Sequence, residues 1–192
     1  NAAWMDELIP ICEERNISVV EDASESLGTV YNSGKYNGKF TGTVGDLGCL
    51  SFNGNKIITS GSGGMILTNN AKLAKKAHYL TTQAKDDPIN YIHNEIGYNF
   101  RLSNILAALG LAQIEQLPMF LKKKRNIFLK YRTALKDIEG LEIAGCPKYA
   151  NNNHWMDLLQ IDSKAYGEDS ELLLKRLERR GIQTRPVWSL NH

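Results

Sequence analysis

One lysine among small polar residues has the clearest chemical potential in this sequence. Lys56 follows the run Asn53-Gly54-Asn55, and Ser51 lies five residues before it. A lysine amine desolvated among small residues loses its proton and can form a Schiff base with a carbonyl carbon. The hydroxyl of Ser51 and nearby backbone N–H groups could bind a phosphate. The alternative for Lys56 is an ordinary surface lysine in a loop.

A second reactive group is the carboxylate of Asp22. It follows the short apolar run at 17–20, which is typical of a buried strand. A carboxylate held at the end of such a strand needs a partner, and a cationic ligand nitrogen is a suitable one. The alternative is an aspartate that caps a following helix.

The elements that must position these groups follow an α/β order. Apolar residues at helical spacing predict a helix over 2–15, directly before the strand at 17–20. Sheets of this kind bind ligands at the carboxyl ends of their strands, where Asp22 and Ser51 would lie. Ten of the sixteen glycines lie between Gly28 and Gly64, so this segment is expected to consist mostly of loops. Further strands are predicted at 47–52 and 65–68, and a helix at 70–80.

A long polar loop is expected over 81–100, and loops of this length are often functional. Asn99 and Arg101 end it, where they could contact an anion at a helix N-terminus or serve as ordinary polar residues at a helix start. Ser103 is the expected N-cap of the next helix. The remaining predicted elements are helices at 102–116, from Pro118 to about 135 and at 170–180, and strands at 155–161 and 182–187, with a domain boundary near Pro118.

Composition and charge argue against several other classes of function. The net charge of +2 removes the electrostatic case for nucleic acid, and the basic run 122–125 is interpreted as a solvated helix face. No apolar run approaches the roughly 18 residues of a membrane span. The three cysteines form no CxxC pair, so no metal site is expected, and a reducing compartment such as the cytoplasm fits best. The histidines show no ligand spacing, and His78, His93 and His154 are interpreted as surface or hydrogen-bonding residues.

Taken together in order and spacing, the motifs closely resemble those of the DegT-type nucleotide-sugar aminotransferases. These are pyridoxal 5′-phosphate (PLP) enzymes of the aspartate-aminotransferase fold, fold type I. The motifs that carry the resemblance are Glu-Asp-Ala-Ser-Glu-Ser-Leu-Gly at 21–28, Ser-Phe-Asn-Gly-Asn-Lys at 51–56, Gly-Ser-Gly-Gly-Met at 61–65, Gly-Tyr-Asn-Phe-Arg-Leu-Ser-Asn at 97–104, Ala-Ala-Leu-Gly-Leu-Ala-Gln at 107–113 and Thr-Arg-Pro-Val-Trp at 184–188.

The resemblance implies an α/β fold made of two parts. Residues 1–117 would be the later part of the PLP-binding large domain, with its mixed sheet. Residues 118–192 would be the connecting helix and most of an α+β small domain. We expect a further N-terminal portion before Asn1 and a continuation past His192, so that the 192-residue chain alone is inactive and binds PLP poorly.

The resemblance also implies a role for each matching residue. Lys56 would be the lysine that bonds to the cofactor and moves the proton during transamination. Asp22 would pair with the pyridinium nitrogen, Ser51 would bind the phosphate, and Glu25 would lie near the ring hydroxyl. Asn99 would reach the phosphate from the neighbouring subunit of a homodimer. Candidate substrate contacts are Arg101, Trp188 and His192.

Two departures from the commonest family pattern bear on the substrate. Glu25 stands where many members have Gln, and Ser62 stands where many have Glu. The Glu25 change is shared with members that act on UDP-linked 4-keto-6-deoxy-N-acetyl sugars, on routes to legionaminic acid and bacillosamine-type sugars. The resemblance therefore favours a C4 aminotransferase with L-glutamate as amino donor.

Two other kinds of family member remain as alternatives. One is a PLP-dependent enzyme of sugar deoxygenation, which would have His at the position of Lys56. The other is a non-catalytic relative, and the joint presence of Asp22, Ser51 and Lys56 argues against it.

Overall fold

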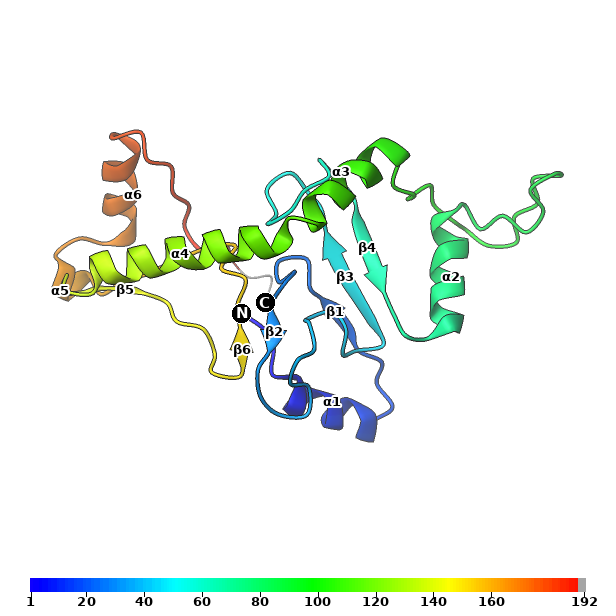
Figure 1. The fold of residues 1–192 in the computed structure, drawn as a ribbon, viewed down its shortest axis with the longest axis horizontal. Helices are drawn as coiled ribbons and strands as arrows, with labels where there is room; N and C mark the ends of the chain where they lie inside the picture. The colour runs from blue at the N-terminus through cyan, green and yellow to red at the C-terminus, as the bar shows by residue number, and fades with distance from the viewer. Residues whose placement is uncertain (190–192) are drawn as a thin grey trace. The chain divides into compact units, whose positions relative to one another are not determined.

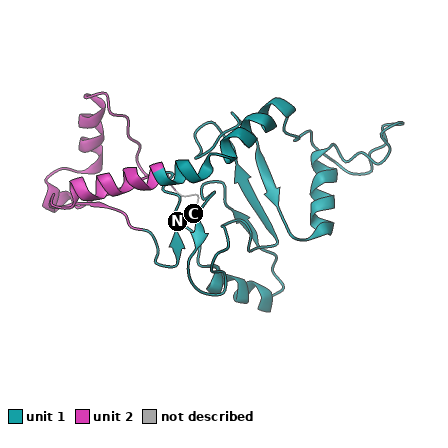
Figure 2. Ribbon diagram, viewed as in Figure 1, with its two compact units in different colours: residues 1–122, 146–155 teal, residues 123–145, 156–192 magenta. Residues whose placement is uncertain are grey.

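The computed structural model describes residues 1–189 and divides into two compact units (Figure 2). The first comprises residues 1–122 and 146–155, and the second comprises residues 123–145 and 156–192, of which 190–192 are not described. The division falls inside helix α4 (Leu117–Leu135). The correspondence of these units to the two domains expected from the sequence remains a prediction.

A three-stranded sheet organises the first unit. The strands β1 (Val20–Asp22), β3 (Leu47–Ser51) and β4 (Gly64–Leu67) lie side by side with β3 in the middle (Figure 1). β3 runs parallel to β1 and antiparallel to β4. Because β1 and β3 are parallel, their carboxyl ends lie side by side at the same end of the sheet, which we call its carboxyl edge.

The strands expected at 47–52 and 65–68 are confirmed, whereas the buried strand expected at 17–20 is wrong in two respects. β1 begins only at Val20, and Val20 is exposed. The physical reason is position, since β1 is an edge strand of the sheet in the described chain.

A small apolar core lies against one face of this sheet. It consists of Ala23, Leu50, Phe52 and Ile58, all buried, with Leu117 and Phe120 of α4 among the residues packed around it. Burying a side chain of the size of Ile, Leu or Phe contributes about 1.5–3 kcal/mol. Side chains alternate along a strand, so Cys49 and Ser51 lie on the face of β3 opposite to Leu50.

A second cluster joins the two ends of the first unit's sequence. Helix α1 (Met5–Glu14) buries Met5 and Ile9 against Tyr31 and Ala150, which confirms the helix expected at 2–15. Strand β2 (Val30–Tyr31) pairs in antiparallel fashion with β6 (Ala150–Asn151). This pairing returns residues 146–155 to the sheet-containing unit.

The helices expected after β4 are confirmed. Helix α2 (Ala71–Thr81) is capped by the side chain of Asn70, and α3 (Asn104–Ile114) by Ser103, whose Oγ accepts the N–H of Leu106 at 3.4 Å. No residue of α3 is buried, and Ile105 is 82% exposed, so its apolar residues are not packed in this chain. The helix from Pro118 to about 135 is also confirmed, as α4.

The second unit contains the later part of α4, a two-stranded antiparallel sheet and two short helices. Strand β5 (Leu141–Ile143) pairs with β7 (Leu159–Ile161), followed by α5 (Ser163–Tyr166) and α6 (Ser170–Glu178). Helix α6 confirms the helix expected at 170–180. The strand expected at 155–161 is confirmed only for its last three residues.

The strand expected at 182–187 is wrong. The structure places neither a helix nor a strand between Ile182 and Ser189, and every residue of that segment is exposed. A strand needs a neighbour that satisfies its backbone groups, and the described residues supply none there. None of the described helices is by itself long and apolar enough to cross a membrane, although the bent pair α3–α4 meets that criterion by length and composition taken together.

Candidate active site

Lys56 lies in a turn directly after the central strand β3. Its backbone N–H donates to the carbonyl of Asn53 at 3.0 Å, which closes the turn. Phe52 before the turn and Ile58 after it are both buried in the core, so each side of the turn is fixed. The Lys56 side chain is only 13% exposed, which excludes the alternative of a freely solvated surface lysine.

Two groups face the amine of Lys56. The Oε1 atom of Glu25 lies 3.2 Å from Lys56 Nζ, and the centroid of the Trp155 ring lies 4.6 Å from it. The Glu25 side chain is about half exposed, so the ion pair contributes little to stability, of the order of 0–1 kcal/mol. The ion pair matters for geometry, because it places the carboxylate of Glu25, which follows β1, beside the amine of Lys56, which follows β3.

The carboxylate of Asp22 is held in its ionised form. The hydroxyl and the backbone N–H of Ser24 both hydrogen-bond to it, and these bonds together with the charge of Lys56 lower the pKa of Asp22 below its ordinary value. The backbone bond, from Ser24 N to Asp22 Oδ1, is 3.1 Å long. Asp22 therefore caps a turn, and the alternative of a helix cap is not what the structure contains.

Ser51 shares an edge and a face of the sheet with Asp22. Asp22 is paired with Cys49, and paired residues of parallel strands point to the same side, as do Cys49 and Ser51 along β3. Ser51 Oγ accepts the N–H of Asn53 at 3.3 Å. The run 61–64 then returns the chain to β4 through positive φ angles at Gly61 (+89°) and Gly63 (+88°), which explains glycine at both positions.

Glu21, next to Asp22 in the sequence, has a different structural role. Its carboxylate accepts backbone N–H groups from Gly42 at 2.8 Å and from Val44 and Gly45 at 2.6 Å each. It therefore fastens a loop to β1. Of these two adjacent acidic residues, only Asp22 lies on the side of the sheet that carries Ser51.

Two other candidate residues of the first unit, Asn99 and Arg101, are not brought to Lys56. Asn99 is exposed and lies beside the end of α2, where it forms an isolated bridge with Thr82. Arg101 is also exposed, and within residues 1–189 no hydrogen bond or ion pair joins Asn99 or Arg101 to Lys56. Trp188 is exposed and belongs to the second unit. His192 lies outside the described residues.

Sequence reasoning missed two residues that contact this site, Asn153 and Trp155. Asn153 donates from its amide nitrogen to the carbonyls of Glu25 and Leu27, and the Trp155 indole donates to the carbonyl of Asn55 at 2.7 Å. The sequence offered one signal, a run of three asparagines before His154 and Trp155, but Trp155 was expected in a strand and His154 as a surface or hydrogen-bonding residue. His154 is buried, so the surface alternative is wrong.

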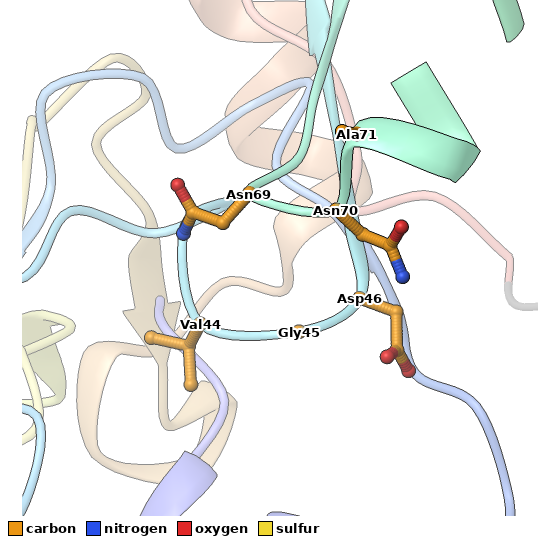
Figure 3. A pocket seen from close by; sticks show the side chains of 6 residues that line it. All are labelled: Val44, Gly45, Asp46, Asn69, Asn70 and Ala71. Atoms are coloured by element: carbon orange, nitrogen blue, oxygen red, sulfur yellow. The ribbon is translucent and has the colours of Figure 1, made fainter. Parts of the chain in front are cut away.

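Figure 3 shows a hollow of about 610 Å³ lined by residues 44–46 and 69–71. These residues lie before β3 and after β4, at the opposite end of the sheet from Lys56. Two of the hollow's three polar side chains, those of Asp46 and Asn70, already serve the fold. Asp46 Oδ2 accepts the N–H of Val19 at 2.8 Å, and Asn70 caps α2. Because these groups are engaged in structural hydrogen bonds, the hollow is not the candidate site.

These features define a class of protein, an α/β protein with a half-buried lysine, an ionised carboxylate and a hydroxyl at the carboxyl ends of parallel strands. Comparison with known families gives the particular family. The DegT/DnrJ/EryC1/StrS aminotransferase family matches residues 1–192, and the chain belongs to this family.

Several curated relatives align with nearly the whole chain. The chain is 42% identical to a pyridoxal phosphate-dependent aminotransferase named EpsN from Bacillus subtilis, over 100% of this chain and 47% of that protein. It is 36% identical to GDP-perosamine synthase of Escherichia coli O157:H7, over 96% and 48%. A UDP-4-amino-4,6-dideoxy-N-acetyl-beta-L-altrosamine transaminase of Campylobacter jejuni is 35% identical over 66% of this chain and 33% of that protein.

Solved structures confirm the fold class expected from the sequence. The crystal structure of DesI, in the presence of its TDP-sugar product, matches with a TM-score of 0.85 and 27% identity, over 96% of this chain and 45% of that chain. The fold is therefore the fold type I architecture of PLP-dependent sugar aminotransferases. The chain spans about half the length of the curated relatives it matches.

Proposed function

We propose that the full-length protein carries out PLP-dependent transamination of a nucleotide-linked sugar. The observation that carries this proposal is the largely buried amine of Lys56, 3.2 Å from the Glu25 carboxylate at the sheet edge shared with Asp22 and Ser51. Family membership supports the same reaction.

The donor set fits pyridoxal 5′-phosphate in its chemistry. The ionised carboxylate of Asp22 would pair with a protonated ring nitrogen, and the lowered pKa of Asp22 keeps that carboxylate charged at neutral pH. The hydroxyl of Ser51 would donate to a phosphate oxygen, and the amine of Lys56 would bond to the aldehyde carbon, whose oxygen leaves as water. When bound, the cofactor supplies an electron sink for the carbon that loses its proton.

The residues around Lys56 suit a lysine that takes up and returns a proton. Glu25 Oε1 lies within hydrogen-bond reach of Lys56 Nζ, at 3.2 Å, and would orient the amine. The low exposure of the Lys56 side chain limits access of water to that proton. Lys56 would then move the proton between the two carbons that exchange the amino group.

For the substrate we propose a 4-keto-6-deoxy sugar that is aminated at C4, with L-glutamate as donor, for bacterial surface sugar biosynthesis. Glu25 and the altrosamine transaminase relative support a UDP-linked N-acetylhexosamine. The relative that is a GDP-perosamine synthase supports a GDP-linked sugar instead. The retained Lys56 disfavours the dehydratase-like alternative.

We further propose a homodimer in which Asn99 reaches the phosphate site of the partner. The loop that contains Asn99 supports this, because its large apolar side chains are strongly exposed in the single chain: Ile89, Tyr91, Ile96, Tyr98 and Phe100. Monomeric proteins rarely expose contiguous apolar surface on this scale. The three free cysteines support the proposal that the protein works in a reducing compartment such as the cytoplasm. We also propose that residues 1–117 belong to the large domain and residues 118–192 to the connecting helix and the small domain.

Borohydride trapping tests the proposed cofactor lysine. The full-length protein is mixed with PLP, reduced, digested and mapped by mass spectrometry. We expect the pyridoxyl tag on Lys56, and no tag at that position in Lys56→Arg. A tag on a different lysine, or none in a folded protein, would refute the proposed function.

A panel of UDP-, GDP- and dTDP-linked 4-keto-6-deoxy sugars tests the substrate. We expect the highest kcat/KM with the UDP-linked N-acetyl sugar and formation of 2-oxoglutarate from L-glutamate. A preference for the GDP-linked sugar would overturn the nucleotide and leave the reaction type in place.

A further inference from the structure

We propose that Asn153 and Trp155 are positioning residues that align Lys56 with Glu25 for attachment to the cofactor. This inference rests on the proposed function in one respect, namely that PLP is the group to which Lys56 attaches. Asn153 contacts the segment after β1, and Trp155 contacts the turn after β3. Both residues lie about 100 residues or more further along the chain, and together they connect the two segments.

Asn153 fastens the segment that carries Glu25. It is 3% exposed, and its amide nitrogen donates to the carbonyls of Glu25 at 2.9 Å and Leu27 at 3.0 Å. Its Oδ1 accepts the N–H of Trp155 at 3.0 Å, and its own backbone N–H donates to Thr29 Oγ1 at 3.1 Å. Every polar group of the buried side chain is therefore used, and removing it would leave the carbonyls of Glu25 and Leu27 without this donor.

Trp155 fastens the turn that carries Lys56. The indole N–H donates to the carbonyl of Asn55, the residue directly before Lys56, at 2.7 Å. The face of the same ring lies 4.6 Å from Lys56 Nζ, within the range of a cation–π interaction. One side chain therefore restrains both the backbone before the lysine and the end of its side chain.

The backbone between these two residues has an unusual conformation. His154 is buried and has a φ of +51°, in the left-handed region that non-glycine residues rarely adopt. Such conformations persist where the surroundings determine them, and they gather at functional sites. Here the bend lies between the residue that contacts the Glu25 segment and the residue that contacts the Lys56 turn.

The two contacts have a kinetic consequence. An unrestrained lysine side chain samples many rotamers, and only a few of them place the amine against a bound aldehyde. Restricting the amine to productive geometry accelerates attachment without strengthening the initial binding of the cofactor. The inference therefore predicts an effect on the attachment step that loss of stability alone would not produce.

The experiment compares Trp155→Leu and Trp155→Phe in the full-length protein, with Trp4→Leu as matched control. Trp4 is half exposed and stacks on Tyr149 at 5.1 Å between ring centroids, so its replacement also removes a tryptophan with an aromatic partner. Cofactor-free protein is mixed with PLP, and the absorbance change of covalent attachment is followed over a range of PLP concentrations. Hydrogen exchange of the amides at 53–58 is measured without cofactor.

We expect the first-order attachment rate to fall about tenfold in Trp155→Leu and about threefold in Trp155→Phe, which keeps the ring face but loses the indole N–H. The initial binding constant for PLP should change less than twofold, and exchange at 53–58 should accelerate in both variants. Trp4→Leu should match the wild-type protein in all three measurements.

Other results separate the two proposals. A Trp155→Leu protein with wild-type attachment and wild-type exchange would overturn the positioning role. An equal slowing in Trp4→Leu would also overturn it, because the effect would then be general destabilisation. A wild-type protein that never attaches PLP at Lys56 would refute the proposed function, and the exchange at 53–58 would still decide whether Trp155 positions the turn.

Discussion

Two irregular segments of the first unit differ in how they are stabilised. Residues 52–63 connect β3 to β4 and carry Lys56, whereas residues 82–103 connect α2 to α3 and carry Asn99. In the first segment Ile58 is 1% exposed and Ser60 is fully buried. In the second, Ile96 is 82% exposed, and the loop runs outward past α2 before it returns to α3 (Figure 1).

The difference teaches which part of the proposed site this chain completes by itself. The Lys56 segment obtains its contacts from the sheet core and from residues 153–155 of the same unit. The Asn99 segment has local hydrogen bonds, mainly to Asp86 and Asp87. Several of its large apolar side chains are strongly exposed, with Ile89 at 84% and Ile96 at 82%. The first segment is preorganised within the chain, and the second would be covered only by a surface outside it.

The largest expected effect comes from removing the amine in the first segment. In the full-length protein, Lys56→Ala should lower the rate of the half-reaction with L-glutamate by about 10³-fold or more, because both nucleophile and proton carrier are lost. Lys35→Ala is the control, since Lys35 also lies over an aromatic ring, at 5.3 Å from that of Tyr36. Single-turnover absorbance measures this rate. A near-normal rate in Lys56→Ala would refute the proposed catalytic role of Lys56.

Matched isoleucine truncations sharpen the contrast in burial. Ile58→Ala should lower the free energy of unfolding by about 2–5 kcal/mol at any protein concentration, because it leaves a cavity in the core. Ile96→Ala should change it by less than about 0.5 kcal/mol at low protein concentration, because that side chain is exposed. Urea denaturation at two protein concentrations measures both. Equal, concentration-independent losses would mean that the second segment is packed within its own chain.

Subunit mixing tests whether a second copy covers the Asn99 segment. Asn99→Ala should weaken PLP binding about tenfold, as expected for one lost phosphate contact. If Asn99 acts across a homodimer, equal amounts of Lys56→Ala and Asn99→Ala subunits, mixed at a PLP concentration too low to load the Asn99→Ala site, should produce about one quarter of wild-type activity, from dimers with one intact site. Activity no higher than the sum of the separate variants would place Asn99 in the site of its own chain or in no site.

The smallest expected effect concerns acid. The backbone N–H of Asn94 lowers the pKa of Asp86, and that of Asn90 lowers the pKa of Asp87. A lowered pKa contributes stability that is present above the ordinary value of 3.8 and is lost as the pH falls through the lowered value. Amide protection at 89–94 should therefore persist at pH 5 and decline only below pH 3.8, and Asp87→Asn should reduce it at neutral pH. Loss of protection already at pH 5 would contradict this sign.

The local parts of the fold were readable from the sequence. The helices α1, α2, α3, α4 and α6 were expected from patterns within a few residues, such as apolar spacing and the N-cap Ser103. Strands without a clear partner were less readable, since β1 starts later than expected and residues 182–187 form no strand. Strand formation depends on pairing with distant residues, which periodicity in one segment does not report.

For the site, the sequence by itself determined which chemical groups are present and the family to which they belong. Lys56, Asp22 and Ser51 lie in short motifs whose order along the chain identified them. Only the tertiary structure decided what surrounds the lysine, because Asn153 and Trp155 reach it through contacts that span 128 and 100 residues. These contacts depend on the pairing of β2 with β6, which brings residues near 150 back to the first unit. A pattern within one short segment of sequence does not predict that pairing.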